Sequence, residues 1–359
     1  KIFLFKKMNL FINGLSSQDV LTSYNFARNS DVVFSETVTH QQFSELNKDN
    51  DLEIIFKNSY LVFYVQKKFE LSENNIIFTN TYFIDNLFEI LREVKHLKNI
   101  KLITHQTDIP ITEKIYKNKP DCISEWYSIN VDFEHKDLIS LPLGLANYYS
   151  PKNVFKESFQ KLTFNKNPKL SLYINYKINT NSQERKKLRS IFINKDWVVF
   201  KEPSDDLEAY IKDLNKYKFI LSPWGNGYDT HRFWETLYSG SIPVTKQHIT
   251  YNSASGLPIL FVNDYKNLTK SDLFNFLENT NFEKIDYKKL KIGYWLDLIN
   301  ENINEDTLEE SQIIENLVYK KFIQKYNQRA NKENKIKRIL FRVNQIKKIP
   351  FKLIEIFRK

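Results

Sequence analysis

The sequence predicts an α/β protein made of two α/β domains followed by a basic helical tail. Short apolar runs alternate with amphipathic helical stretches twice along the chain, a pattern typical of β-α units around a largely parallel sheet. A length of 359 residues also favours two domains over one. Residues 151–168 lose periodicity and gain Pro, Asn and Ser. We therefore expect domains at 1–150 and 169–308, joined by a linker at 151–168.

The first domain is predicted from six apolar runs and one clear helix. The helix covers residues 82–97, because its apolar side chains recur at the spacing of one helical face. The expected strands are Met8–Ile12, Asp31–Phe34, Leu61–Tyr64, Asn75–Phe78, Ile100–Ile103 and Leu138–Leu141.

The second domain repeats this alternation with sharper boundaries. Its expected strands are Lys169–Ile174, Trp197–Phe200, Lys218–Leu221, Ser241–Val244 and Ile259–Val262. Its expected helices are Ser182–Phe192, Ser204–Leu214, one that Asp229-Thr230 opens, and one from Leu273. A closing helix is expected at 309–330, before the basic tail at 331–359.

One segment of the second domain carries most of the functional signal. Residues 219–245 read FILSPWGNGYDTHRFWETLYSGSIPVT and hold three of the seven glycines of the chain. Clustering in a glycine-poor chain indicates backbone that turns tightly or lies against a ligand. An apolar strand, a Gly-rich loop, a helix start and a second strand follow one another here. The order predicts a ligand-binding loop at the carboxyl end of a strand.

The residue types around this loop suit an anionic nucleotide. A helix N-terminus attracts anions, and Arg232 in the first turn adds a charge-assisted donor for phosphate oxygens. Glu235 lies one turn further on and can accept hydrogen bonds from ribose hydroxyls. Gly225 and Gly227 would let the backbone approach the ligand. The alternative is a plain turn with Arg232 and Glu235 facing solvent.

The string Trp-Gly-Asn-Gly-Tyr-Asp-Thr-His-Arg-x-x-Glu, followed by Ser-Gly-Ser-Ile-Pro-Val, resembles the donor site of GT-B glycosyltransferases, most closely the exostosin-like group. Inverting fucosyltransferases of bacterial surface glycans have a similar layout, with a Glu-Lys pair in place of the arginine. The resemblance covers about 30 residues and implies two Rossmann-like domains facing a cleft. Ser241 departs from the group, which often has Cys there. The expected donor-binding residues are Asn175, Lys177, Arg185, Lys201, Gly225, Asn226, Gly227, Asp229, Thr230, His231, Arg232 and Glu235.

By the same resemblance, a general base would come from the first domain. Asp108 is the first candidate and His105 the second, because both follow the strand Ile100–Ile103. A helix-capping role is the alternative for Asp108. Glu36 and His40, after another strand, are the alternates.

The acceptor side is predicted at Asn13 and Gly14, after the first strand. Trp126 and Tyr127 could stack on a sugar face, with core packing as the alternative that we favour for them. No His, Asp or Glu set has metal-ligand spacing, so we expect no metal and no cofactor apart from the nucleotide-sugar substrate.

The charge distribution argues against a nucleic-acid surface on the body of the protein. Residues 331–359 carry +8 of the net charge of +10, which leaves about +2 for the rest. Apolar and basic residues alternate in the tail at helical spacing, a pattern typical of a helix that lies on an anionic membrane. A helix packed on the body and a nucleic-acid contact are the alternatives.

These observations predict a cytoplasmic glycosyltransferase, peripheral on the inner face of a bacterial membrane. Cys122 is the single cysteine, which fits a reducing compartment. The enzyme would transfer a sugar to a glycan or lipid-linked glycan hydroxyl with inversion, in capsule or lipopolysaccharide synthesis. A GT-B-like nucleotide-sugar epimerase and a nucleic-acid-binding protein using the tail are the alternatives.

Overall fold

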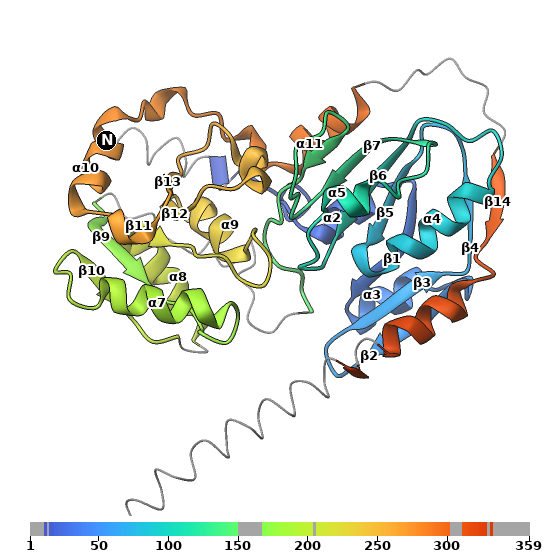
Figure 1. Cartoon of the computed structure of the whole chain (residues 1–359), viewed down its shortest axis with the longest axis horizontal. Helices are drawn as coiled ribbons and strands as arrows, with labels where there is room; N and C mark the ends of the chain where they lie inside the picture. The colour runs from blue at the N-terminus through green and yellow to red at the C-terminus, as the bar shows by residue number, and fades with distance from the viewer. Residues whose placement is uncertain are drawn as a thin grey trace, which may run out of the picture. The chain divides into compact units, whose positions relative to one another are not determined.

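The structure is a computed structural model and describes residues 11–12, 14–149, 167–203, 206–301, 311–328 and 331–332. Two sheets organise the fold, and both belong to one compact unit, residues 1–314; residues 315–359 form a second unit. The α/β class with two largely parallel sheets is therefore confirmed (Figure 1).

The first sheet has seven strands, in the order β2-β3-β1-β5-β6-β7-β8. The five strands from β1 to β8 in this order pair in parallel, and the β2–β3 hairpin extends the edge of β1 in antiparallel fashion. The strands are β1 (Val32–Val38), β2 (Leu52–Lys57), β3 (Val62–Gln66), β5 (Ile76–Asn80), β6 (Ile100–His105), β7 (Ile123–Ser128) and β8 (Leu138–Ser140).

The second sheet has five strands, all parallel, in the order β10-β9-β11-β12-β13. The strands are β9 (Lys169–Ile174), β10 (Val198–Phe200), β11 (Tyr217–Leu221), β12 (Ile242–Lys246) and β13 (Leu260–Val262). The direction in which successive strands are added to the sheet reverses between β9 and β11, because β10 lies on one side of β9 and the later strands lie on the other. This topological switch point is where open parallel sheets bind ligands, at the carboxyl ends of the strands.

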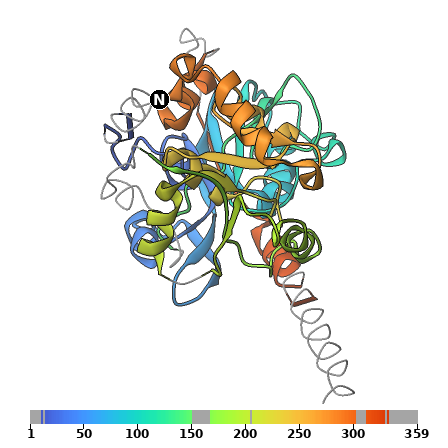
Figure 2. The same cartoon turned by 90° about the vertical axis from the view of Figure 1, so that its left-hand side faces the viewer.

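Helices cover both faces of the second sheet, as Figure 2 shows from the side of this sheet. They are α7 (Ser182–Phe192), α8 (Leu207–Lys216), α9 (His231–Tyr238) and α10 (Lys270–Asn279). Alternate residues of a strand point to opposite faces. Leu172 and Ile174 pack with α7 and α10, whereas Tyr173 and Ile220 pack with α8. Burial on both faces explains why these strands are continuous apolar runs.

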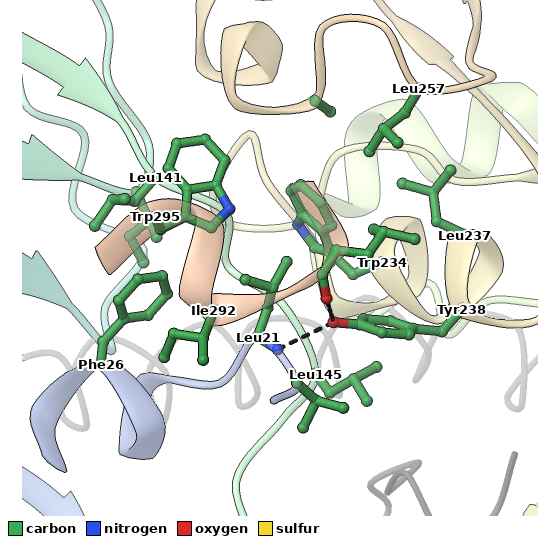
Figure 3. Close-up of a cluster of buried hydrophobic side chains, with 14 of the residues drawn as sticks. Leu21, Phe26, Leu141, Leu145, Trp234, Leu237, Tyr238, Leu257, Ile292 and Trp295 are labelled. Atoms are coloured by element: carbon green, nitrogen blue, oxygen red, sulfur yellow. Dashed lines mark hydrogen bonds between the residues drawn. The ribbon is translucent and has the colours of Figure 1, made fainter. Parts of the chain in front are cut away.

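A shared hydrophobic core joins the two sheets (Figure 3). Leu21 and Leu145 come from the first half of the chain and pack with Trp234 and Trp295 from the second. The backbone N–H of Leu21 also donates to the Tyr238 hydroxyl at 3.0 Å. The side chains that meet here are almost fully buried, so this core fixes α9 against the first half of the chain.

Helix α11 (Ile292–Asn300) brings the chain back to the first sheet. The N–H of Ile292 donates to the carbonyl of Asp19, and the buried Lys101 ammonium in β6 donates to the carbonyl of Ile299 at the other end of the helix. A lysine at a helix C-terminus is favourably placed for the helix dipole. Both ends of α11 are therefore held by residues of the first half.

Shorter elements complete the part of the chain that is described. They are α2 (Ser23–Arg28), α3 (His40–Leu46), β4 (Lys68–Leu71), η1 (Thr81–Phe83), α4 (Ile84–Glu93), α5 (Glu113–Tyr116), η2 (Ile249–Ala254), η3 (Tyr265–Asn267), η4 (Phe282–Lys284), η5 (Tyr287–Leu290) and β14 (Gln312–Glu315), which pairs with β4. None of the described helices has the length and apolar character needed to cross a membrane.

Two predicted elements are wrong in part. The closing helix at 309–330 contains strand β14, and helix occupies only residues 319–328 of what is described there. The apolar residues of β14 are equally compatible with a strand, and pairing with β4 decides between the two. Phe11 and Ile12 are helical rather than the end of a strand. The predicted linker, apart from residues 167–168, and the tail beyond residue 332 lie outside the described residues.

Candidate functional site

The candidate site lies at the switch point of the second sheet. Two loops leave the carboxyl ends of adjacent strands there: residues 175–181 after β9, and residues 222–230 after β11. The second of these is the Gly-rich loop that the sequence singled out. Its position confirms the expectation that the loop follows a strand and opens a helix, α9.

Arg185 on α7 ties these two loops together. Its Nε donates to the carbonyl of Trp224 at 3.1 Å, and its Nη1 donates to the carbonyl of Lys177 at 2.9 Å and to the hydroxyl of Thr180 at 2.5 Å. Burial, followed by the nearby charge of Arg232, lowers the pKa of Arg185 to about 10. Arg185 therefore holds the two loops together and also places a positive charge between them.

Arg185 and Arg232, at this switch point, have no carboxylate ion-pair partner in the described chain. Arg232 lies close enough to Arg185 to lower its pKa, and within the described chain neither guanidinium forms an ion pair with a carboxylate. The Nη1 of Arg232 is buried and has no hydrogen-bond partner among the described groups, and the same holds for the Thr230 hydroxyl. A buried, unpaired donor is costly. An anion held between the two arginines would satisfy it.

The start of α9 adds a further feature that attracts anions. Thr230 is the N-cap residue, but its side chain makes no capping hydrogen bond. The first amides of α9 are therefore left without a capping side chain, at the positive end of the helix dipole. The Nδ1 of His231 lies 2.8 Å from the carbonyl oxygen of Gly144. A carbonyl oxygen can only accept a hydrogen bond, so Nδ1 carries the proton and donates.

Glu235 and Arg232 share one partner, Tyr210 on α8. The Tyr210 hydroxyl donates to Oε2 of Glu235 at 2.7 Å. The guanidinium carbon of Arg232 lies 5.1 Å from the centroid of the same ring. Burial is the main cause that raises the pKa of Tyr210 well above its usual value. The ring therefore orients both side chains that the sequence assigns to the nucleotide.

The two loop glycines differ in what surrounds them. A Cβ on Gly227 would lie 2.9 Å from the side-chain amide of Asn130, whereas a Cβ on Gly225 would meet Arg185 at an ordinary 3.5 Å. Asn130 uses its amide oxygen to accept the backbone N–H of Asp229 at 3.0 Å. Gly227 therefore leaves room for a protein contact, and it also lines the cavity beside the loop, so its predicted role in ligand approach stays a prediction.

Asp229 also acts within the protein. Its carboxylate accepts hydrogen bonds from the N–H groups of Leu143 and Thr230 and from the indole of Trp234, at 2.8 to 2.9 Å. Burial raises the pKa of Asp229 to about 7. This carboxyl holds the loop against the first half of the chain, which gives Asp229 a structural role beside the donor-binding role predicted for it.

A cavity of about 410 Å³ opens at this junction. One wall is the Gly-rich loop with Arg185, and the opposite wall is the segment after β6 together with residues 143–149. The predicted site residues that line it are His105, Asp108, Arg185, Gly225, Asn226, Gly227, Asp229, Thr230 and His231.

Asp108 is the exposed carboxylate of this cavity, and Asn226 donates to its Oδ2 at 3.3 Å. The segment that carries it follows β6 directly, because strand pairing with β5 and β7 ends at residues 104–105. Asp108 does not cap a helix, since α5 has Thr112 as its N-cap. The carboxylate is therefore available to a ligand.

His105 differs from Asp108 although both line the cavity. The backbone N–H of Gln106 donates to Nδ1 of His105 at 2.9 Å, so Nε2 carries the proton and points to the carbonyl of Pro142 at 3.4 Å. Burial lowers the pKa of His105 to about 3. Neither ring nitrogen keeps a free lone pair, so the geometry favours Asp108 as the base.

The alternate bases lie away from this cavity. Glu36 is inside β1 rather than after a strand, fully buried, and accepts from Arg28 at 2.5 Å and from the Tyr64 hydroxyl at 3.1 Å. Burial raises the pKa of Glu36 to about 7. His40 begins α3 and its Nε2 contacts the carbonyl of Asn58. Neither residue is among those that line the 410 Å³ cavity.

The acceptor-side predictions are not supported. Trp126 and Tyr127 belong to β7 and are 0% and 2% exposed, so they are core residues, which agrees with the alternative reading. The Trp126 indole donates to the Thr104 hydroxyl at 2.8 Å. Gly14 is exposed in a turn and does not line the cavity, and Asn13 lies outside the described residues.

Three other predicted donor residues sit behind or beside the cavity. Lys201 is paired with Asp213, at 2.7 and 2.8 Å from its two oxygens. Asn175 donates to the Tyr173 hydroxyl at 2.9 Å. Lys177 is exposed in the loop after β9, and its carbonyl accepts from Arg185. None of the three lines the 410 Å³ cavity, and neither do Arg232 and Glu235.

The site also contains residues that the sequence analysis did not select. Asn130 contacts Asp229, 99 residues away in the sequence, and Tyr210 contacts Glu235, 25 residues away. No local sequence pattern identifies either residue. Trp224 and Tyr228 lie inside the Gly-rich segment, and this position in the sequence is the one signal that could have identified them as site residues. Within the described ranges, no group of three or more His, Cys, Asp or Glu is arranged to hold a metal ion.

Comparison with known proteins gives a likeness among solved structures. No family model and no curated protein matches the sequence. The chain is similar to a crystal structure of an α1,3-fucosyltransferase, with 12% identity and a TM-score of 0.33, over 64% of this chain and 78% of that chain. It is also similar to α1,3-fucosyltransferase with GDP-fucose (15% identity, TM-score 0.29, 70% and 77% covered) and with GDP (14%, 0.29, 70% and 76%).

Proposed function

We propose that this protein is a GT-B glycosyltransferase that moves a sugar from a nucleotide-sugar donor to a hydroxyl of a glycan or lipid-linked glycan. One observation carries the proposal. Arg185 and Arg232 lie near each other at the switch point of the second sheet, neither pairs with a carboxylate in the described chain, and Arg232 keeps a buried donor without a partner. A diphosphate between them would neutralise both charges.

The donor would bind with its diphosphate at the start of α9. The uncapped helix amides and the two guanidinium groups would hold the phosphate oxygens. Glu235, already fixed by Tyr210, would accept hydrogen bonds from the ribose hydroxyls. The sugar would then lie in the 410 Å³ cavity, opposite Asp108.

The reaction would be a direct displacement. The acceptor oxygen bonds to the anomeric carbon as the bond from that carbon to the phosphate oxygen breaks, and the acceptor proton passes to the Asp108 carboxylate. The nucleoside diphosphate leaves with the electron pair of the broken bond, and Arg185, Arg232 and the helix dipole stabilise its charge. Attack from the face opposite the phosphate inverts the anomeric centre.

The basic tail suggests where the enzyme works. Ten basic and two acidic residues lie in 331–359, interleaved with apolar ones. Each basic residue near anionic headgroups contributes on the order of 1 kcal/mol. Our proposal is therefore a peripheral enzyme on the cytoplasmic face of a bacterial membrane, acting in surface polysaccharide synthesis.

The transferase proposal is tested with Asp108→Asn in the full chain. The variant should bind nucleoside diphosphates as the wild type does and lose transfer of a labelled sugar, because the proton acceptor is gone. Glu113→Gln, an exposed carboxylate on α5, is the matched control and should keep the rate. A near-normal rate in Asp108→Asn excludes this residue as the base. Sugar isomerisation without any acceptor would instead indicate an epimerase.

A further inference from the structure

A second cavity of about 330 Å³ adjoins the first across the Gly-rich loop. Asp108 and the loop residues 225–227 line both cavities. The walls that belong to the second cavity alone include Trp224, Tyr228 and Asn181. The Asp108 carboxylate therefore stands at the junction of two neighbouring spaces.

Two aromatic rings form a corner in the second cavity. The ring centroids of Trp224 and Tyr228 are 5.1 Å apart at an interplanar angle of 83°. Both side chains are partly exposed, unlike the fully buried Trp126. Partly exposed aromatic faces beside a cavity are available to a ligand.

The corner is supported from behind. The His248 ring stacks on Tyr228 at 3.7 Å and 19°, and lies 5.4 Å from Trp224. Asp132 lies 3.3 Å from Nε2 of His248 and also hydrogen-bonds the Tyr228 hydroxyl. Both rings are therefore held in place before a ligand binds, which lowers the entropic cost of binding.

The chemistry of this cavity differs from that of the first. Its polar side chains are one carboxylate, Asp108, and two amides, those of Asn181 and Asn226, while Arg185 and Arg232 are not among its lining residues. A carboxylate with no cation among the lining residues disfavours phosphate, and the ammonium of Lys246, outside this lining, lies 5.4 Å from the centroid of the Trp224 ring. Aromatic faces combined with carboxylate and amide groups suit a neutral ligand that has one apolar face and many hydroxyls, which describes a pyranose ring.

We propose that the acceptor sugar binds in this second cavity, with its apolar face on the Trp224–Tyr228 corner and its reacting hydroxyl at Asp108. The inference rests on the proposed transferase function and gives the acceptor a position. The donor sugar occupies the larger cavity, the acceptor the smaller one, and Asp108 takes the proton at their junction.

The test uses the full chain labelled with 5-fluorotryptophan and observed by fluorine NMR. The chain has five tryptophans, and the signal of Trp224 is assigned with Trp224→Phe. Methyl glucoside, methyl galactoside, N-acetylglucosamine and lactose are titrated with a saturating nucleoside diphosphate present. At least one saccharide should shift the Trp224 signal and leave that of the buried Trp126 unchanged.

Variants separate stacking from other effects. Tyr228→Ala should weaken saccharide binding roughly tenfold because it removes the buried ring face. Tyr228→Phe should stay within about threefold, and Tyr60→Ala, an exposed tyrosine at the β2–β3 turn, should match the wild type. Nucleoside diphosphate affinity should be the same in all three variants.

Two results would overturn the inference. One is that no saccharide moves the Trp224 signal although the nucleoside diphosphate binds. The other is that the nucleotide alone produces the full shift and binds more weakly to Tyr228→Ala, which would make the corner a nucleobase site. Failure of every nucleoside diphosphate to bind the wild type would instead count against the proposed function. A saccharide shift would then still support the sugar site.

Discussion

The side-chain oxygen of Asn130 accepts the backbone N–H of Asp229 at 3.0 Å, and this bond joins the end of β7 to the Gly-rich loop. The Asn130 amide also donates to the carbonyl of Thr107, beside Asp108. One asparagine therefore sets the spacing between the proposed donor loop and the proposed base. Its position depends on Gly227, which leaves room for it.

Gly227→Ala should destabilise the protein and weaken nucleotide binding. The new methyl group would displace Asn130, and overpacking of this kind costs typically about 1–3 kcal/mol. Thermal unfolding and calorimetry with a nucleoside diphosphate measure the two effects. Gly225→Ala is the matched control, because its added methyl group meets its neighbours at ordinary contact distance, so its unfolding temperature should stay close to that of the wild type. Equal behaviour of the two variants would contradict this role of Asn130.

Glu235 should determine whether the protein recognises ribose hydroxyls. The wild type should bind a nucleoside diphosphate more tightly than its 2′,3′-dideoxy analogue, and Glu235→Ala should bind the two equally, because the acceptor for those hydroxyls is gone. Tyr210→Phe should reduce the preference in part, since it frees Glu235 but keeps the ring beside Arg232. Calorimetry with both ligands is the measurement. A full preference in Glu235→Ala would place the ribose elsewhere.

His105 should make the fold sensitive to acid. Its pKa falls from an ordinary 6.5 to about 3 on folding, because burial disfavours the charged ring. A depressed folded pKa contributes stability that is present above pH 6.5 and lost as the pH falls from there towards 3. The loss is at most about 1.4 kcal/mol per pH unit.

The free energy of unfolding of the wild type minus that of His105→Gln isolates this effect from other titrating groups. The difference should decrease between pH 6.5 and 4 and should be constant from pH 7 to 8. A difference that does not change with pH would mean that His105 is not buried as a neutral ring.

The second sheet was the most predictable part of the fold. Strand β9 and helix α7 begin and end at the predicted residues. Strands buried on both faces are continuous apolar runs, and the amphipathic period of α7 is clear, so local sequence carries the answer.

The first sheet was less predictable, for a physical reason. Strand β7 reads ISEWYS, in which polar residues interrupt the apolar run, and it is not among the strands that the sequence predicts. Its pairing with β6 and β8 supplies what the local pattern lacks. The same dependence on long-range contacts limited the prediction of the site. The Gly-rich loop could be identified from the sequence, whereas Asn130 and Tyr210 belong to the site through contacts with residues distant in the sequence.

The basic tail should anchor the protein to membranes. Deletion of residues 331–359 should abolish flotation with vesicles that contain anionic lipid, because most of the net positive charge is removed. The full chain should float with anionic vesicles, release at high salt, and ignore neutral vesicles. Transfer to a soluble acceptor should survive the deletion. Flotation of the truncated protein would assign membrane binding to another part of the chain.

The central claim is that the switch point of the second sheet binds the diphosphate of a nucleotide sugar, and titration calorimetry with a panel of nucleoside diphosphates tests it most directly. At least one should bind the wild type, and Arg232→Ala should lose roughly tenfold to hundredfold in affinity, as for a hydrogen bond to a charged group. Arg189→Ala, an exposed arginine of α7, is the matched control and should bind normally. Unchanged affinity in Arg232→Ala, with both variants folded, would contradict the account.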